Sequence, residues 1–263
     1  MYEDLAGHFD YAEENGIATI TLGRPERRNA LTPDDYRGLR DLSTTLKTRD
    51  DLSVLVFKGS EGAFCAGGDL DLTAAALLNK GARAQHDFMR ITGELTRNLR
   101  EMPAVVVAAI DGVAAGAGAA IALAADFRVL STRASLAFVF TKIGLAGGDM
   151  GTAWLLQRQI GLSAATEILM LGNPVSAEQA QALNLAHRVV SPEGMAECLA
   201  QLTAELKDRS ARGLAMTKQI LNRTASVDYA TGLDMETWTQ SLLMAGPEFT
   251  GFLQNWVDRP RRK

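Results

Sequence analysis

Cysteine and histidine are scarce in this sequence. The 263 residues include two cysteines, Cys65 and Cys198, and three histidines. Two cysteines are too few for a disulfide framework, so we expect reduced thiols in a cytoplasmic protein. No grouping of histidine, cysteine and carboxylate residues has the spacing of a metal site, and no phosphate-binding loop G-x-x-x-x-G-K-[ST] occurs. The sequence therefore predicts neither a metal nor a separate cofactor.

A surplus of positive charge and a long apolar run are also lacking. The chain has 27 basic and 31 acidic residues and a formal charge of −4 at pH 7, so nucleic acid is not an expected partner. The most apolar run, residues 113–125, is shorter than the roughly 20 residues of a membrane span. Residues 1–10 lack the basic and apolar character of a signal peptide. We expect no membrane contact and interpret the apolar run as a buried helix.

Short apolar segments alternate with helical patterns over most of the chain. The alternation predicts strands at 17–22, 54–57, 104–110, 127–130 and 136–140, and helices at 33–48, between 70 and 102, and up to 125. From residue 163 onward the pattern is helical almost throughout. This order predicts an α/β fold with a core domain at residues 1–195 and a helical C-terminal region at residues 196–263.

Two turns built from small residues follow predicted strands. The first, residues 64–69, reads F-C-A-G-G-D, and the second, residues 112–119, reads G-V-A-A-G-A-G-A. Small residues allow a ligand to approach the backbone closely, and the second turn opens a helix whose first N–H groups are unpaired. Side by side, the two turns would offer two N–H groups to one oxygen, as in an oxyanion hole. Tight packing of a strand against a helix is the alternative interpretation.

Several segments carry a resemblance to a known family. They are residues 24–31, R-P-E-R-R-N-A-L, residues 64–70 and 109–126 around the two turns, and the later segments 168–180 and 249–260. In these segments the chain resembles the crotonase superfamily, the enoyl-CoA hydratase/isomerase family. The matching segments follow in order along nearly the whole chain. The resemblance implies a crotonase-like ββα spiral core with a helical C-terminal trimerisation region, assembled as a homotrimer or hexamer. It also implies an acyl-CoA thioester as the substrate, with CoA as part of that substrate.

The resemblance also implies roles for individual residues. By position, the two N–H groups that hold the thioester oxygen in the family belong to Gly68 and Ala117. The segment 24–31 matches the part of the family that wraps the CoA nucleotide. The substrate-binding residues implied by the resemblance are Arg28, Ala30, Ala66, Gly116 and Phe140.

The chain departs from the hydratases of this family at two positions. Hydratases carry glutamates where this sequence has Ala120 and Phe140, and neither side chain can position water or deliver a proton. Asp149 remains, in a loop where dienoyl-CoA isomerases and a dehalogenase branch of the family place a catalytic aspartate. The loop that contains Asp149 is one residue longer in this sequence than in those enzymes. The alternative is that Asp149 only caps a helix beginning near Met150.

Together these features predict a lyase or isomerase that stabilises an acyl-CoA enolate, with isomerisation favoured over simple hydration. Hydrolytic or dehalogenase-like chemistry through Asp149 is a second hypothesis, and a crotonase-like binding protein without catalysis is a third. His86, Glu94 and Cys65 are weaker candidates, since an exposed helix histidine, a solvated helix face and core packing explain them. The basic end, residues 259–263, is interpreted as a solvated tail.

Overall fold

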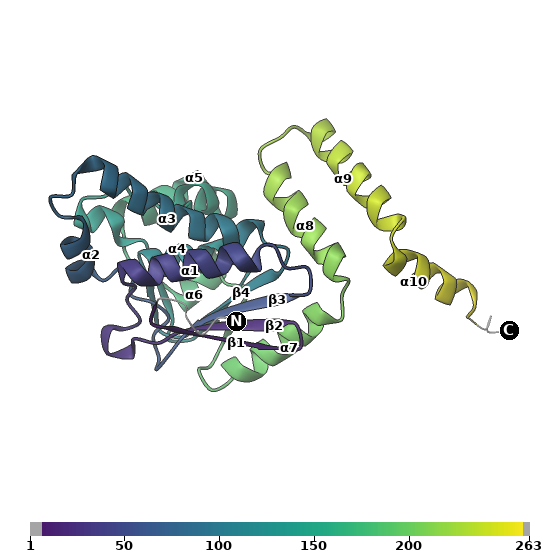
Figure 1. The fold of residues 1–263 in the computed structure, drawn as a ribbon, viewed down its shortest axis with the longest axis horizontal. Coiled ribbons are helices and arrows are strands. Elements are labelled where there is room, and N and C mark those ends of the chain that lie inside the picture. Colours follow the sequence, from purple (N-terminus) through teal and green to yellow (C-terminus); the bar gives the residue numbers. More distant parts are fainter. Residues whose placement is uncertain (1–6, 260–263) are drawn as a thin grey trace.

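The computed structural model describes residues 7–259, so the basic end lies almost wholly outside the described residues (Figure 1). The strands are β1 (Phe9–Glu14), β2 (Ile17–Leu22), β3 (Val54–Gly59), β4 (Val105–Ile110), β5 (Val113–Ala115), β6 (Phe127–Ser131), β7 (Ser135–Ala137), β8 (Val175–Ser176) and β9 (Arg188–Val190). The helices are α1 (Pro33–Leu46), α2 (Leu70–Leu77), α3 (Gly81–Glu101), α4 (Ala117–Ala124), α5 (Thr152–Leu171), α6 (Ala177–Ala182), α7 (Met195–Lys207), α8 (Ala211–Thr224), α9 (Tyr229–Met244) and α10 (Pro247–Val257). Short 3-10 helices occur at Pro25–Arg27 and Val139–Ile143. The predicted α/β organisation is confirmed.

The main sheet is buried on both faces. Its strand order is β1-β2-β3-β4-β6-β9, and every pairing is parallel except that of β1 with β2. Along β3, Leu55 and Phe57 belong to the core under α1 and α3, whereas Val54 and Val56 belong to the core under α7. Figure 1 shows α1 and α3 on one side of the sheet and α7 on the other. A parallel sheet covered in this way needs strands that are apolar on both faces, as β3 and β4 are.

A small second sheet, β5-β7-β8, joins the two turns identified in the sequence. Cys65 and Ala114 form a parallel β-bridge. The N–H of Cys65 donates to the carbonyl of Val113 at 3.0 Å, and the N–H of Ala115 donates to the carbonyl of Cys65 at 2.8 Å. The turn after β3 is thereby bonded, backbone to backbone, to the strand that leads into α4.

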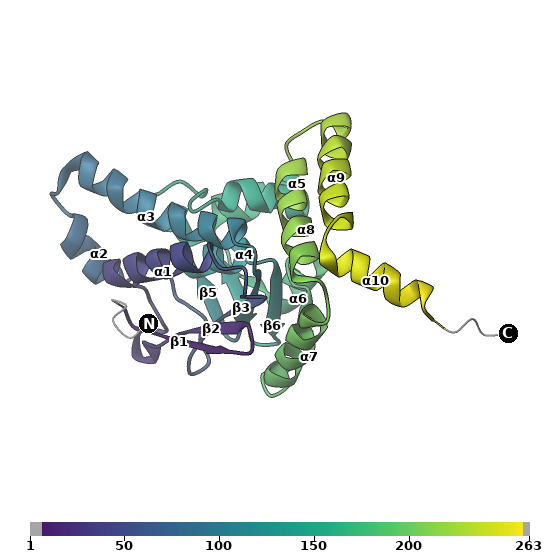
Figure 2. The ribbon, with the colours of Figure 1, turned by 45° about the vertical axis from the view of Figure 1, so that its right-hand side comes forward.

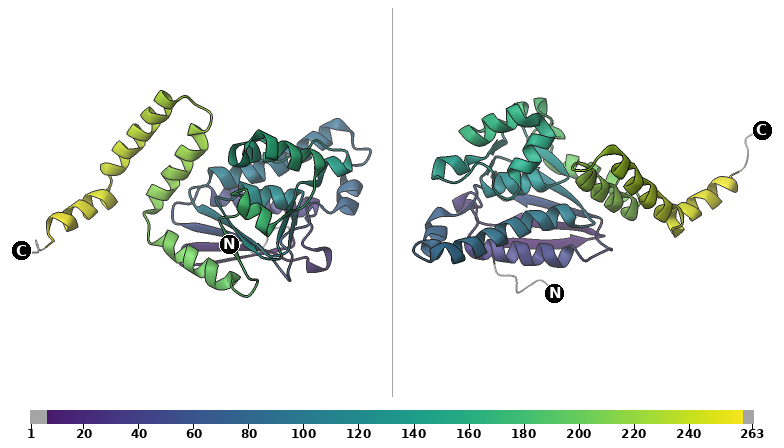
Figure 3. Two further views of the ribbon diagram at one scale, coloured as in Figure 1. Left: turned by 180° about the vertical axis from the view of Figure 1, so that it is seen from behind. Right: turned by 90° about the horizontal axis from the view of Figure 1, so that it is seen from above.

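The last three helices extend away from the sheet. Figure 2 shows α8 and α9 side by side with α10 projecting beyond them, and Figure 3 shows the same arrangement from behind and from above. Lys218 ties α8 to the core, because its Nζ donates to the carbonyls of Leu99 at 2.8 Å and Ala104 at 2.9 Å. The same Nζ lies 2.7 Å from Oδ2 of Asp126. The predicted domain boundary at residues 195–196 falls at the start of α7.

The helices α9 and α10 expose large apolar side chains. They include Trp238, 74% exposed, together with Leu242, Trp256 and Val257. Several large exposed apolar side chains on adjacent helices are typical of contact with another chain. None of the helices within residues 7–259 is long and apolar enough to cross a membrane.

The structure differs from the sequence prediction at several boundaries. The predicted helical region 70–102 is two helices, because Asn79 and Gly81 between them have φ of +61° and +78°. The strand predicted at 136–140 ends at Ala137 and continues as a 3-10 helix. The helix expected near Met150 begins at Thr152.

Gly118 provides a test of the contact between the two turns. A Cβ at Gly118 would lie 2.3 Å from the carbonyl oxygen of Cys65 and 2.7 Å from its Cβ. Neither atom can move without separating the turns, so we expect Gly118→Ala to lower the free energy of unfolding by about 1–3 kcal/mol or more. Urea unfolding at a fixed protein concentration measures the change.

Gly93, within α3, is the matched control. A Cβ at Gly93 meets no atom within 4 Å. Alanine is the better helix former, so Gly93→Ala should raise the free energy of unfolding by about 0.5–1 kcal/mol. Equal effects of the two substitutions would show that the turns are not in tight contact.

Candidate functional site

The two turns lie against each other on the wall of a cavity of about 820 Å³. A Cβ at Gly67 would lie 2.9 Å from the carbonyl oxygen of Ala115 and 3.5 Å from the nitrogen of Ala117. Gly67 has φ of +97° and Gly116 has φ of +50°, a region that side chains other than glycine rarely adopt. Conformation therefore favours glycine at both positions, and at Gly67 the close approach of the Ala115 carbonyl also leaves no space for a side chain.

The N–H groups of Gly68 and Ala117 have no hydrogen-bond acceptor within residues 7–259. Their neighbours are bonded: the carbonyl of Gly67 accepts from Leu31 at 2.8 Å, and the N–H of Gly116 donates to Ala137 at 2.8 Å. Ala117 is the first residue of α4, so its N–H lies outside the intrahelical ladder at the positive end of the helix. Both residues line the cavity. Two fixed donors of this kind can stabilise negative charge on one oxygen.

Asp149 reaches the same cavity from the loop before α5. Its Oδ1 accepts a hydrogen bond from the N–H of Met150 at 2.7 Å. The helix begins at Thr152 with Gly151 as its N-cap, and no side chain caps it, so Asp149 is not a plain helix cap. Burial raises the pKa of the Asp149 carboxyl, outweighing the opposing hydrogen bond from Met150. Asp149 is thus a stronger base than an exposed aspartate.

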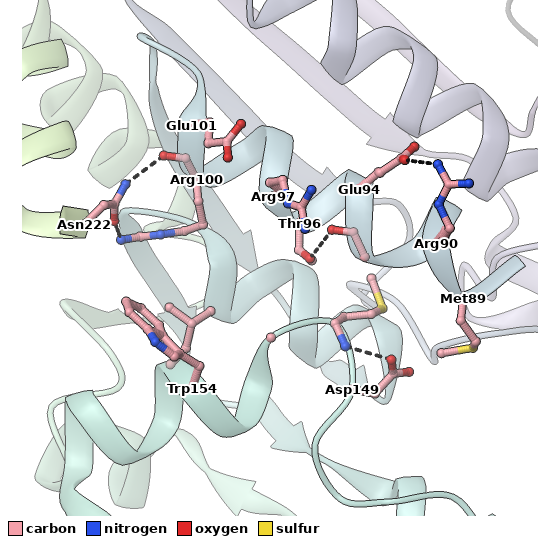
Figure 4. Close-up of a pocket in the computed structure, with 14 residues that line it drawn as sticks. Met89, Arg90, Glu94, Thr96, Arg97, Arg100, Glu101, Asp149, Trp154 and Asn222 are labelled. Atoms are coloured by element: carbon pink, nitrogen blue, oxygen red, sulfur yellow. Dashed lines mark hydrogen bonds and ion pairs between the residues drawn. The ribbon is translucent and has the colours of Figure 1, made fainter. Parts of the chain in front are cut away.

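A second cavity of about 770 Å³ also has Asp149 in its wall (Figure 4). Charged residues of α3 form much of the rest of this wall. Glu94 lies 3.1 Å from Nη1 of Arg40 and 3.2 Å from Nη2 of Arg90, and Figure 4 shows it turned toward Arg90. Hydrogen bonds from Arg40 and then Arg90 hold the pKa of Glu94 below its usual value. Glu94 is consequently a weaker proton acceptor than Asp149.

The structure brings most of the predicted site residues together. Those that line the 820 Å³ cavity are Ala66, Gly68, Gly116, Ala117, Phe140 and Asp149. Arg28 and Ala30 are not part of this wall but adjoin it, because the carbonyl of Arg28 accepts from the N–H of Ala66 at 2.9 Å. Arg28 is exposed, and Ala30 is buried.

The sequence profile of the enoyl-CoA hydratase/isomerase family matches residues 12–257. The chain belongs to this family. It is 34% identical to the 1,2-epoxyphenylacetyl-CoA isomerase of Escherichia coli K12 over 92% of this chain and 90% of that protein. A crystal structure from Streptomyces coelicolor A3(2) shares 41% identity with a TM-score of 0.92, covering 96% of this chain and 92% of its own. A Thermobifida fusca YX protein crystallised in complex with CoA shares 29% identity with a TM-score of 0.86, covering 93% and 96%.

Membership of the enoyl-CoA hydratase/isomerase family confirms the resemblance and the crotonase-like fold class. Of the hydratase positions, Phe140 lies in the cavity wall and Ala120 is buried within α4. Phe138, two residues before Phe140, is fully buried in the core. Within residues 7–259 no cluster of three or more histidine, cysteine or carboxylate side chains is arranged to hold a metal ion.

The weaker candidates in this family member have structural explanations. Burial raises the pKa of the Cys65 thiol to about 12, and its Sγ accepts from the N–H of Gly67 at 3.4 Å. Cys65 therefore stays protonated and is not a nucleophile. His86 is exposed on α3 and belongs to the wall of neither cavity described above.

Sequence reasoning missed two hydroxyl groups of the site. Tyr36 of α1 and Thr73 of α2 both line the 820 Å³ cavity next to Gly68. Tyr36 precedes Leu39 and Leu42 at helical spacing, so the pattern indicates only a core residue. Thr73 lies in a short helix mainly of leucine and alanine residues. Neither position carries a sequence signal for a side chain directed at a ligand.

Asp149→Asn should stabilise the folded protein at neutral pH. Asparagine keeps an oxygen for the N–H of Met150, while the buried charge is removed. Because the pKa of Asp149 is raised by folding, its ionisation destabilises the wild type above that pKa, and the cost disappears as pH falls through it. The melting temperature of the variant should exceed that of the wild type at pH 7–8, and the difference should shrink toward pH 4.

Asp228→Asn is a control for which we expect the opposite change in melting temperature. Asp228 caps α9, and its hydrogen bonds from Thr231 lower its pKa. The ionised form therefore stabilises the fold, and this variant should melt below the wild type at neutral pH, with the deficit shrinking as pH falls through the lowered pKa. A loss of stability in both variants at pH 7 would contradict the desolvation of Asp149.

Proposed function

We propose that this chain is an acyl-CoA isomerase that moves a proton through an enolate. One observation carries the proposal: the unpaired N–H groups of Gly68 and Ala117 and the carboxylate of Asp149 line one cavity. The relative crystallised with CoA and the relative named as an isomerase of a CoA thioester support this substrate class. Arg28 and Ala30 adjoin the wall, which is consistent with CoA lying along residues 24–31.

The proposed reaction needs a single carboxylate. Asp149 removes a proton from carbon, and the C–H electrons move toward the thioester oxygen, which receives the hydrogen bonds of Gly68 and Ala117. The same proton then returns from Asp149 to a different carbon, and the double bond is displaced. No water or other reactant is consumed. Hydration would require a second group to position and deprotonate water, and Ala120 and Phe140 provide none.

We also propose that the enzyme is a cytoplasmic homotrimer or hexamer. The apolar side chains exposed on α9 and α10 support a contact with another copy of the chain. Light scattering of the purified protein tests this assembly, and a monomer at micromolar concentration would contradict it.

The reaction is tested with a panel of enoyl-, dienoyl- and aryl-acyl-CoA thioesters followed by mass spectrometry. We expect a product of unchanged mass with altered absorbance, and poor hydration of crotonyl-CoA. With Asp149→Asn, turnover should fall at least about 100-fold, because an amide cannot accept the proton. Acyl-CoA binding should remain, since the variant leaves the Gly68 and Ala117 donors in place.

Asp208→Asn is the control for this substitution. Asp208 is an exposed aspartate after α7 whose Oδ2 lies 2.8 Å from Nη1 of Arg209, outside both cavity walls. It should leave turnover unchanged.

In the thioester panel with the wild type, a mass gain of one water would favour hydration, and release of free CoA would favour hydrolysis. Full turnover by Asp149→Asn would remove Asp149 from the chemistry.

A further inference from the structure

Two hydroxyl groups in the cavity have no hydrogen-bond partner. Tyr36 is 4% exposed, and its hydroxyl makes no hydrogen bond within residues 7–259. Its ring packs edge-on against Phe88, with a centroid distance of 5.4 Å and an interplanar angle of 87°. The Oγ1 of Thr73 is buried and also has no partner in this part of the chain. A buried hydroxyl without a partner is costly, so such groups normally pair with protein, water or ligand.

Both hydroxyls are close to the backbone donor at Gly68. A Cβ at Gly68 would lie 3.1 Å from the Tyr36 hydroxyl and 3.8 Å from Oγ1 of Thr73. Most side chains in the surrounding wall are apolar, among them Leu70, Leu77, Phe88, Met89, Phe140 and Leu145. The Tyr36 and Thr73 hydroxyls of this mostly apolar cavity thus lie beside the point where the thioester oxygen is expected.

The chemistry of the two groups suits an oxygen acceptor. Burial, with a smaller contribution from nearby charges including Asp149, raises the pKa of Tyr36 well above its usual value. The phenol therefore remains a hydrogen-bond donor throughout the neutral range. Thr73 lies in α2, where a threonine can bond the carbonyl four residues earlier. The structure shows no such bond, so its hydroxyl is available.

We propose that Tyr36 and Thr73 bind an oxygen substituent of the acyl group, close to the thioester. The substrate is then an oxygenated acyl-CoA, bearing a hydroxyl, oxo or epoxide oxygen, and not a plain hydrocarbon chain. The inference rests on the proposed function, because the N–H of Gly68 fixes where the thioester oxygen lies. A cavity that hydrogen-bonds a substituent discriminates against analogues lacking it, since its own polar groups are then left unpaired.

Matched thioesters test this inference by isothermal titration calorimetry at pH 7. The pairs are butanoyl-CoA with 3-hydroxybutanoyl-CoA, butanoyl-CoA with 3-oxobutanoyl-CoA, and phenylacetyl-CoA with 2-hydroxy-2-phenylacetyl-CoA. In at least one pair the oxygenated member should bind the wild type about fivefold to tenfold more tightly. Tyr36→Phe keeps the ring against Phe88 and should bring that ratio close to one, while the Kd of the unsubstituted member changes less than about threefold.

Thr73→Val is the second variant, because it replaces the hydroxyl by a methyl group of similar size, and it should also reduce the ratio. A ratio near one for all three pairs in the wild type would overturn the inference, as would a ratio unchanged in both variants. Equal loss of turnover on every thioester in Tyr36→Phe would place its hydroxyl on the thioester or on water instead. If no CoA thioester binds at all, the proposed function itself fails.

Discussion

The backbone contact between the two glycine turns is the constraint on which the site depends. Parallel strands end at the same edge of a sheet, so the turns after β3 and after β4–β5 emerge side by side. The Cys65–Ala114 bridge then fixes their separation, and Gly67 and Gly118 leave room for no side chain between them. The free N–H groups of Gly68 and Ala117 follow from this arrangement. They are held by the main chain, so no side chain has to be ordered when charge develops on a bound oxygen.

The sequence predicts the strands and turns around the site because the patterns that define them are local. Short apolar runs define β2, β3, β4 and β6, and the small residues between them define the turns. It misses β1, where Asp10, Glu13 and Glu14 obscure the inward-facing Tyr11. It also places the start of α5 too early. Met150 adopts φ of +50°, a left-handed conformation that is uncommon for methionine and cannot be predicted from the sequence. Both β1 and the start of α5 depend on tertiary contacts that the local sequence pattern does not contain.

The resemblance singles out Asp149 and leaves Glu94 a weaker candidate, but the relative basicity of these two acids cannot be predicted from the sequence. Asp149 and Glu94 both border the second cavity, yet their pKa values move in opposite directions. Glu94 is held by Arg40 and Arg90, which come from two different helices, whereas Asp149 is partly buried and has no cationic partner within residues 7–259. A carboxylate beside arginines binds its proton weakly, and one in apolar surroundings binds it more strongly. Only the fold shows which acid has basicity suited to taking a proton from carbon.

A single basic carboxylate limits the chemistry that the cavity can support. In the proposed isomerisation Asp149 both removes and returns the proton, so both reacting carbons would have to lie within reach of one carboxyl group, which favours a short proton shift along the acyl chain. The apolar side chains around it lower the local polarity, which strengthens the interaction of an enolate with the fixed N–H groups. Tyr36 and Thr73 contribute to this wall two hydroxyl groups that have no hydrogen-bond partner within residues 7–259. Their hydroxyls lie beside Gly68, so in the proposed complex they would orient the acyl group over Asp149 when that group carries an oxygen that they can bind.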